Sequence, residues 1–203
     1  MEVKPPARRS QAQRTAATRS TLLAAARKLF SENGFADVST QSIVEAAGVT
    51  RGALYHQFAD KVELFAAVYE EIEAEIVVQI AEGIVEAAPS DQLQAMKVGA
   101  RLFLDFCSAP DFQRIGLVDA PAVLGWDRWR AIGVKYGLGV IEAMLGQAVA
   151  DGVIPAQPMR PTAHLLLGAL DEAALYVSRA QDPAEAKAEM YAVCDRIISG
   201  IAG

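Results

Sequence analysis

The stretch Thr40–Lys61, TQSIVEAAGVTRGALYHQFADK, decides the fold, because it has the pattern of two short helices joined by a tight turn. Gly48 stands at the turn, where a positive backbone φ is usually needed. Val49 follows it and is placed to fill the gap between the helices. Leu54 and Phe58, four residues apart, are placed to hold the second helix to a hydrophobic core. The stretch therefore predicts a helix-turn-helix.

The face of the second helix opposite this core carries residues that suit the major groove of DNA. Arginine reads guanine edges, threonine contacts a thymine methyl group or a phosphate, and glycine allows a close backbone approach. Tyrosine, lysine and a helix N-terminus suit phosphate oxygens. Each of these side chains could equally be an ordinary solvated or packed residue. The candidate DNA-binding residues are Thr40, Thr50, Arg51, Gly52, Tyr55, His56 and Lys61.

Helical signals continue on both sides of this stretch. Upstream, apolar residues recur at helical spacing until Asn33 and Gly34, which form a natural left-handed stop. Downstream, Asp60 precedes Glu63 at the spacing of a capping box, and apolar residues then repeat every four positions toward Pro89. The helices expected here are 11–32, 41–47 with Ser39 or Thr40 as its cap, one from after Thr50 to near Phe58, and one that Asp60 caps and that ends at Pro89 at the latest.

The rest of the chain predicts a larger helical unit. Alanine is plentiful and no segment is a convincing strand, so packed helices are favoured over sheets. The stretch 111–125, which contains Pro121, is expected to be irregular. The fold class predicted is all-α, with a three-helix head joined by a long helix to a larger body. The further helices expected in that body are 91–107, 126–150, 161–180 and 183–201.

Composition excludes several classes of protein. Of the 203 residues, 52% are apolar, which argues against a disordered chain. No segment runs 18 apolar residues without a charge, and the N-terminus lacks a signal pattern, so we expect a cytoplasmic protein without a membrane partner. Cys107 and Cys194 are far apart in sequence and both lie in apolar helical stretches, and two such cysteines do not indicate a disulfide framework or a metal site. No cofactor and no metal are expected.

The charges divide unevenly along the chain, although their net value is −6. Residues 1–61 have nine Lys and Arg against five Asp and Glu, whereas residues 62–203 have ten against twenty. A basic head on an acidic body directs the head toward phosphates, although an imbalance this small also occurs by chance. The expected domains are 1–62 for DNA binding, with 1–10 as a disordered basic arm, and 63–203 for ligand binding and dimerisation.

The helix-turn-helix stretch resembles the tetracycline-repressor (TetR) family. That family has an "AAGV" turn and a recognition segment of the form "GALY..F..K..L". They appear here as Ala46-Ala47-Gly48-Val49 and Gly52-Ala53-Leu54-Tyr55, followed by Phe58, Lys61 and Leu64. The resemblance covers about residues 15–70 in its motifs. It implies a transcriptional repressor that binds a palindromic operator as a homodimer and is released by a small-molecule effector.

Two positions depart from the family pattern. Val44 stands where the family usually has alanine, which affects the packing of the two short helices. Gln57 stands where it often has histidine, and His56 lies one position earlier. The phosphate contact often given to that histidine therefore does not transfer to His56. Gln57 could hydrogen-bond a phosphate in its place, so it joins the candidate DNA-binding residues.

The resemblance also implies a ligand pocket in the body, for which the sequence offers candidates and no code. Aromatic residues could line an apolar cavity, and a few polar residues could orient a ligand within it. Asp105 is the favoured polar residue, because it lies amid apolar residues and needs a partner if buried. The aromatics could instead be plain core. The candidates are Arg101, Phe103, Asp105, Phe106, Trp126, Trp129 and Tyr136.

The last two expected helices have apolar stripes that could form a dimer interface. Two such helices, paired with their symmetry copies, make a four-helix interface. The stripes could instead face the protein's own core. The candidate interface residues are Leu167, Leu170, Ala174, Val177, Met190, Val193 and Ile197.

Two other classes of function were weighed against a DNA-binding regulator. A helical enzyme is disfavoured, because the chain has two histidines and lacks an HExxH, a G-x-S-x-G or a Gly-rich phosphate loop. A protein-interaction module of the same fold, or a constitutive regulator without a ligand, stays open. Binding that prefers one duplex sequence would exclude the interaction module.

Overall fold

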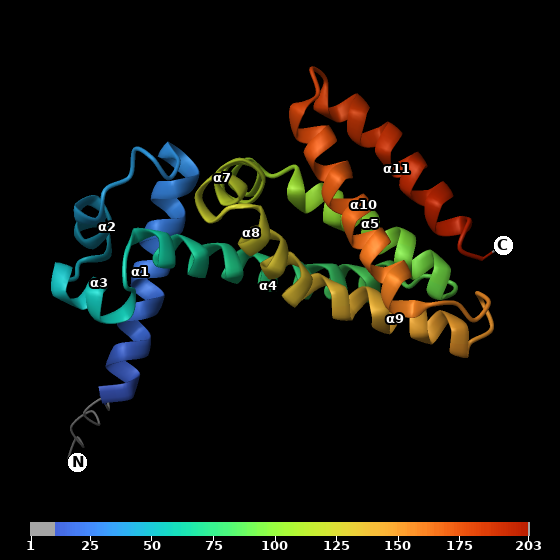
Figure 1. The fold of residues 1–203 in the computed structure, drawn as a ribbon, viewed down its shortest axis with the longest axis horizontal. Helices are drawn as coiled ribbons and strands as arrows, with labels where there is room; N and C mark the ends of the chain where they lie inside the picture. Colours follow the sequence, from blue (N-terminus) through green and yellow to red (C-terminus); the bar gives the residue numbers. More distant parts are fainter. Residues whose placement is uncertain (1–10, 203) are drawn as a thin grey trace, which may run out of the picture. The chain divides into compact units, whose positions relative to one another are not determined.

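The computed structural model describes residues 11–202, and these residues are helical with no strand among them, which confirms the all-α prediction (Figure 1). The chain divides into two compact units, one ending at Val68 and the other beginning at Tyr69. We call the described parts of these units the head (11–68) and the body (69–202). The predicted basic arm, residues 1–10, lies outside the described residues. No helix in the described part of the chain is long and apolar enough to cross a membrane.

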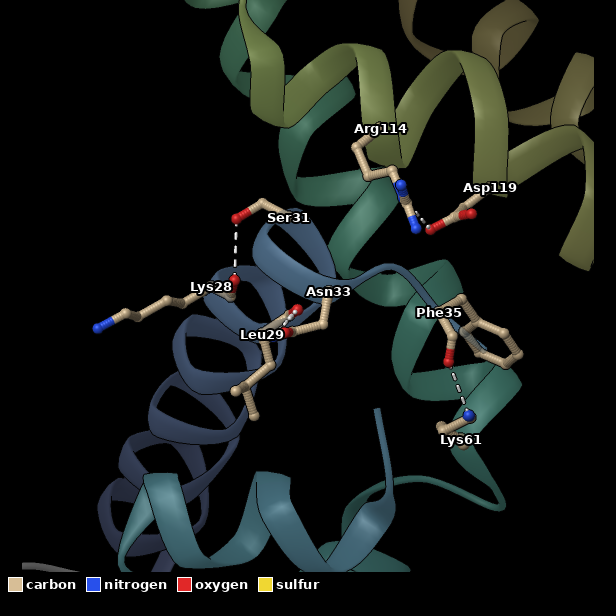
Figure 2. A network of polar contacts seen from close by, with 8 residues as sticks. All are labelled: Lys28, Leu29, Ser31, Asn33, Phe35, Lys61, Arg114 and Asp119. Atoms are coloured by element: carbon tan, nitrogen blue, oxygen red, sulfur yellow. Dashed lines mark hydrogen bonds and ion pairs between the residues drawn. The ribbon is translucent and has the colours of Figure 1, made fainter. Parts of the chain in front are cut away.

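The head consists of α1 (Gln11–Asn33), α2 (Thr40–Ala47), α3 (Arg51–Gln57) and the first turns of α4 (Lys61–Ala87). The ends of these helices lie close to the positions that the sequence predicts. Gly34 has a φ of 80° and its N–H donates to the Phe30 carbonyl at 2.8 Å, which ends α1. The Asn33 side chain donates to the Leu29 carbonyl at 3.1 Å (Figure 2).

Side-chain caps and one glycine shape the turn between α2 and α3. Ser39 is the cap of α2, because its hydroxyl accepts from the Ser42 N–H at 3.0 Å. Gly48 follows α2 with a φ of 64°, in the left-handed region that favours glycine. Thr50 then caps α3 by accepting from the Ala53 N–H at 3.2 Å. The sequence pattern thus fixes both helix starts and the turn between them.

Aromatic rings form the centre of the head. Phe30, Phe35 and Phe65 meet with ring centroids 5.2 to 5.7 Å apart, two of the pairs edge to face. Leu54 is fully buried against this core, which fixes the inner face of α3. Val44, the larger residue at the family's alanine position, is also buried.

The body continues α4 and adds the remaining helices. α5, α10 and α11 pack against one another, with α10 and α11 forming a hairpin (Figure 1). The helices after α4 are α5 (Gln92–Cys107), α6 (Pro110–Phe112), η1 (Gln113–Asp119), α7 (Ala120–Leu124), α8 (Trp126–Gly133), η2 (Val134–Leu138), α9 (Gly139–Ala150), α10 (Met159–Arg179) and α11 (Pro183–Ser199).

The prediction that 111–125 is irregular was wrong, because α6, the π-helix η1 and α7 occupy this stretch. Pro121 lies in the first turn of α7, where a missing N–H is tolerated. In η1 the Ala120 N–H donates to the Ile115 carbonyl, so the next acceptor in the series, the Gly116 carbonyl, faces Pro121, which has no N–H. The indole N–H of Trp129 donates to that carbonyl instead, at 3.1 Å. A side chain from α8 thus satisfies a backbone carbonyl of η1.

The long helix expected over 126–150 is present but interrupted by a second π-helical turn, η2. η2 comes close to α10 at Gly137, where an added Cβ would lie 3.1 Å from a Leu167 methyl group. A glycine therefore permits this approach between the two elements.

Candidate DNA-binding surface and body cavity

Three of the candidate DNA-binding residues form one cluster on the head surface, with Thr40 at the start of α2 and Arg51 and Tyr55 on α3. The Arg51 guanidinium lies 5.6 Å from the centre of the Tyr55 ring. Hydrogen bonds from Arg51 and from Thr40 lower the pKa of the Tyr55 hydroxyl. Tyr55 is nevertheless 44% exposed, so the cluster presents a cation, a hydroxyl and a ring face to the outside.

Thr50, Gly52 and His56 are exposed beside this cluster. The Thr50 hydroxyl also serves as the cap of α3, which ties its position to the helix N-terminus. A Cβ added at Gly52 would meet only the Thr50 hydroxyl oxygen, at 3.9 Å. The protein's own packing therefore does not require glycine at position 52, whereas a partner that approaches the backbone closely would.

A polar groove of about 370 Å³ lies between the first turns of α1 and the side of α3. His56 and Gln57 line it from α3, together with Ala53. From α1 it is lined by Gln11, Arg14, Thr15 and Thr18. Sequence reasoning did not single out these α1 residues as a surface. The available signal was the polar composition of 11–18 at the start of an otherwise amphipathic helix.

Lys61, predicted to contact a phosphate, is hydrogen-bonded within the head. Its ammonium donates to the Phe35 carbonyl at 2.8 Å (Figure 2). It also donates to the Val38 carbonyl at 2.8 Å and lies 4.0 Å from the centre of the Phe35 ring. Partial burial lowers the pKa of Lys61. The side chain therefore ties the α1–α2 connection to the start of α4.

The body contains an apolar cavity of about 110 Å³. Its wall includes Phe103 from α5, Gly133 from α8, Met144 from α9 and Ile198 from α11. The remaining lining residues are Glu73, Ile76, Val77, Ile80, Met96, Gly99, Ala100, Gly137, Val140, Ile141, Leu166, Leu167, Ala169, Leu170, Asp171, Cys194 and Ile197. All of them belong to the body, so the cavity is complete within that unit.

Two carboxyl groups, Glu73 on α4 and Asp171 on α10, supply the charge of the cavity wall. Burial raises the pKa of Glu73 from 4.5 to about 7, although a hydrogen bond from Tyr69 opposes the rise. Burial also raises the pKa of Asp171 from 3.8 to about 6, against the attraction of Arg130, which forms an ion pair with it. Both side chains keep a partly accessible surface because they face the cavity.

Two family models match the chain. The model described as "Tetracyclin repressor-like, C-terminal domain" matches residues 93–201, and the one described as "Bacterial regulatory proteins, tetR family" matches residues 22–68. The chain belongs to the TetR family. The resemblance noted in the helix-turn-helix therefore extends through the body.

Relatives of this TetR-family chain agree in sequence and fold. It is 24% identical to the Transposon Tn10 TetC protein of Escherichia coli over 176 residues, covering 87% of this chain and 88% of TetC. It is 37% identical to the transcriptional repressor AcnR of Corynebacterium efficiens over 70 residues, 34% of this chain and 37% of AcnR. A solved TetR-family regulator from Pectobacterium atrosepticum is 34% identical, with a TM-score of 0.81 over 96% of this chain and 98% of the other.

Of the seven residues predicted for the ligand pocket of this TetR-family body, the cavity wall includes only Phe103. Asp105 is exposed on the outer side of α5, where it accepts from Lys187 at 2.7 Å and from the Tyr191 hydroxyl. Arg101, on the same side, pairs with Asp195 of α11. Apolar neighbours in sequence therefore did not make Asp105 a buried residue, because its partners come from a distant helix.

The predicted aromatic pocket residues are used elsewhere in the body. Phe106 packs edge to face on Phe112, with ring centroids 5.8 Å apart. Trp126 is 63% exposed and Trp129 is buried, and their rings lie 4.9 Å apart. The Tyr136 hydroxyl donates to Glu70 at 3.2 Å. Sequence analysis did not predict Glu73 and Asp171 as cavity residues. The only indication in the sequence was that each places a carboxylate on the apolar face of a long helix.

The predicted dimer stripe on α10 faces the protein's own core. Leu167, Ala174 and Val177 are buried, and Leu170 lines the cavity. On α11, Met190 and Val193 are partly buried, whereas Ile197 is 46% exposed. The other large exposed apolar residues on this hairpin are Leu165 and Tyr176, at 77% and 51%.

Proposed function

We propose that this TetR-family transcriptional regulator is a dimeric repressor, which binds operator DNA through α2 and α3 and leaves it when a small molecule enters the body cavity. The observation that carries the DNA-binding assignment is the surface cluster of Thr40, Arg51 and Tyr55. It places an arginine and a tyrosine together on the exposed side of α3. Such a pair combines base reading with phosphate contact.

The roles within this surface follow from position on α3. Thr50, Arg51 and Gly52 begin the helix, and the N-terminal residues of a recognition helix normally reach base edges. Tyr55, His56 and Gln57 lie one turn later and suit phosphate oxygens, with Thr40 adding a contact at the start of α2. Arg14 shares a groove with His56 and Gln57, which supports a further phosphate contact from α1.

A dimer suits an operator with two half-sites, which lie about 34 Å apart when both recognition helices enter the same side of the duplex. The hairpin of α10 and α11 is the surface we assign to the interface. Leu165, Tyr176 and Ile197 leave apolar area exposed there, which a second copy would cover.

Release by a ligand is supported by the continuity of α4. This helix begins at Lys61 in the head and supplies Glu73, Ile76 and Ile80 to the cavity wall in the body. A ligand that contacts those residues acts on the same helix that Lys61 ties to the head. It would couple to DNA binding if it prefers one of two arrangements of that helix.

Selection of duplexes from a random pool, followed by binding measurements at two salt concentrations, tests the assignment. We expect one preferred sequence, and a loss of affinity of about tenfold or more for Arg51→Ala, because a bidentate arginine–guanine pair contributes about 1 to 3 kcal/mol. Tyr55→Phe should weaken binding to all sequences alike. Arg114→Ala, at an exposed arginine of η1 in the body, is the matched control and should leave affinity unchanged.

The outcomes separate the open alternatives. Wild-type protein without sequence preference would favour a protein-interaction module of the same fold. Specific binding that no small molecule disturbs would favour a constitutive regulator.

A further inference from the structure

We propose that the effector is a small lipophilic amine, whose apolar part fills the body cavity and whose ammonium group pairs with Glu73. This inference rests on the function proposed above, because it names the ligand class of the same cavity. The observation behind it is that the carboxyl groups at the cavity outnumber the cations that pair with them.

The cavity has more carboxyl groups than cations. Asp171 is balanced by Arg130, with which it forms an ion pair. Glu73 has the Tyr69 hydroxyl as its partner, and the one charged group that acts on it among the described residues is Asp171, which repels it. A buried carboxylate without a cation is unfavourable. A ligand ammonium would supply the missing countercharge at the position where it is most stabilising.

The other lining residues and the volume of the cavity indicate the size and polarity of the rest of the ligand. Apart from Glu73 and Asp171 the lining side chains are aliphatic, aromatic or sulfur-containing, or are glycines. An apolar cavity of about 150 Å³ is large enough to bind benzene, and the volume here, about 110 Å³, is on that scale. The ligand is therefore expected to carry one ring or a short branched alkyl group.

Other ligand charges fit this wall less well. A carboxylate or phosphate ligand would add a third negative group beside Glu73 and Asp171, which like-charge repulsion disfavours. A neutral alcohol could hydrogen-bond Glu73 and would leave its charge unbalanced. The amine is therefore the class that the cavity should select.

Binding of an amine should depend on pH in a direction fixed by Glu73. An alkylamine stays protonated up to a pH of about 10, as a lysine side chain does. The Glu73 carboxyl is therefore the group that titrates, and the ligand ammonium binds the ionised carboxylate more strongly than the neutral acid. The groups that face Glu73 or share its cavity are Tyr69 on α4, Cys107 on α5, Asp171 on α10 with Arg130 on α8, and Cys194 on α11; the lining residues of η2 and α9 carry no titratable group.

The direct test is calorimetric titration of the full chain, without DNA, with 2-phenylethylamine, 2-phenylethanol and phenylacetate. We expect the amine to bind at least tenfold more tightly than the alcohol, and the acid not to bind. Amine affinity should rise about tenfold from pH 6 to pH 8, because a carboxyl with a pKa of about 7 goes from about one tenth to about nine tenths ionised.

Glu73→Gln keeps the size of the side chain and removes its charge. In this variant we expect amine affinity to fall at least tenfold and to match that of the alcohol, with no dependence on pH. Glu82→Gln, at an exposed carboxylate of the same helix, is the control and should behave as wild type. Circular dichroism establishes that both variants are folded.

Equal binding of amine and alcohol by the wild type, or unchanged amine affinity in Glu73→Gln, would overturn the proposal. So would a complete lack of amine binding by protein that still recognises its operator, which would leave the proposed regulator intact. Amine binding by protein that recognises no duplex would instead support the ligand class and count against the DNA-binding function.

Discussion

One side chain, Lys61, shows how much a single residue determines in the head. Its ammonium reaches two carbonyls of the connection between α1 and α2, more than twenty positions earlier in the chain. The Phe35 ring covers the same ammonium. A surface lysine would have been free to meet phosphate, whereas this one holds the connection that precedes the helix-turn-helix.

Lys61→Met should lower the free energy of unfolding of the head by about 1 to 3 kcal/mol, because it leaves two carbonyls without their donor. Urea denaturation followed by far-ultraviolet circular dichroism measures this loss. Lys28→Met, at an exposed lysine of α1, should have almost no effect. If Lys61→Met retained full stability and reduced only the salt dependence of DNA binding, the phosphate role would be correct after all.

At the scale of elements, the segment from α6 to α8 depends on a bond between helices. The π-helix η1 leaves the Gly116 carbonyl facing a proline, and the Trp129 indole N–H on α8 satisfies it. Trp129 is buried, and its neighbour Trp126 is largely exposed. We therefore expect Trp129 to contribute more to the stability of the body than Trp126.

Trp129→Phe should destabilise the body by about 2 to 4 kcal/mol, because it removes the indole donor of the Gly116 carbonyl and shrinks a buried ring. Trp126→Phe is the matched control and should cost less than about 1 kcal/mol. Thermal unfolding of the two variants compares them directly. Equal losses would show that the indole hydrogen bond does not hold η1 in place.

The hairpin of α10 and α11 should govern the oligomeric state. Leu165→Glu places a charge on the most exposed large apolar residue of α10 and should shift a dimer to monomer, as measured by light scattering over a range of concentrations. Val85→Glu makes the same kind of change at an exposed residue of α4 and should leave the mass unchanged. A Leu165→Glu variant that stays dimeric would remove this hairpin from the interface.

The sequence predicted those elements whose signals are local, and it missed arrangements that depend on distant partners. Ser39, Gly48 and Thr50 act within three residues of the backbone groups that they satisfy, so the helix-turn-helix could be placed closely. Asp105 was expected in a pocket, yet Lys187 and Tyr191 hold it on the surface from far along the chain. Residues from seven helical elements line the cavity, and no local sequence pattern predicts that these elements pack around one space.

At the scale of the whole molecule, the buried acids of the cavity make stability depend on pH. Folding raises the pKa of Glu73 from 4.5 to about 7, so the folded chain holds this proton over a pH range in which the unfolded chain has lost it. The free energy of unfolding therefore falls as pH rises through that range. Asp171, with its pKa raised to about 6, acts in the same direction.

Glu73→Gln should remove the contribution of Glu73 to this dependence, leave that of Asp171, and gain up to about 3 kcal/mol on the wild type between pH 4 and pH 8. Carboxylates outside the cavity titrate alike in both proteins, so the difference between the two unfolding curves reports Glu73 together with its repulsion of Asp171. Chemical denaturation at four pH values supplies these curves. Parallel curves at every pH would show that Glu73 is solvated in the folded protein.

The placing of the two tryptophans gives the molecule a built-in optical reporter. Trp126 and Trp129 are the only indoles in the chain, and both stand on α8, whose last residue, Gly133, belongs to the cavity wall. Tryptophan fluorescence, excited selectively over that of tyrosine, therefore observes the body alone. Its emission should respond when the cavity fills and stay silent while the head melts, so the two halves of the regulator can be followed separately in unlabelled protein.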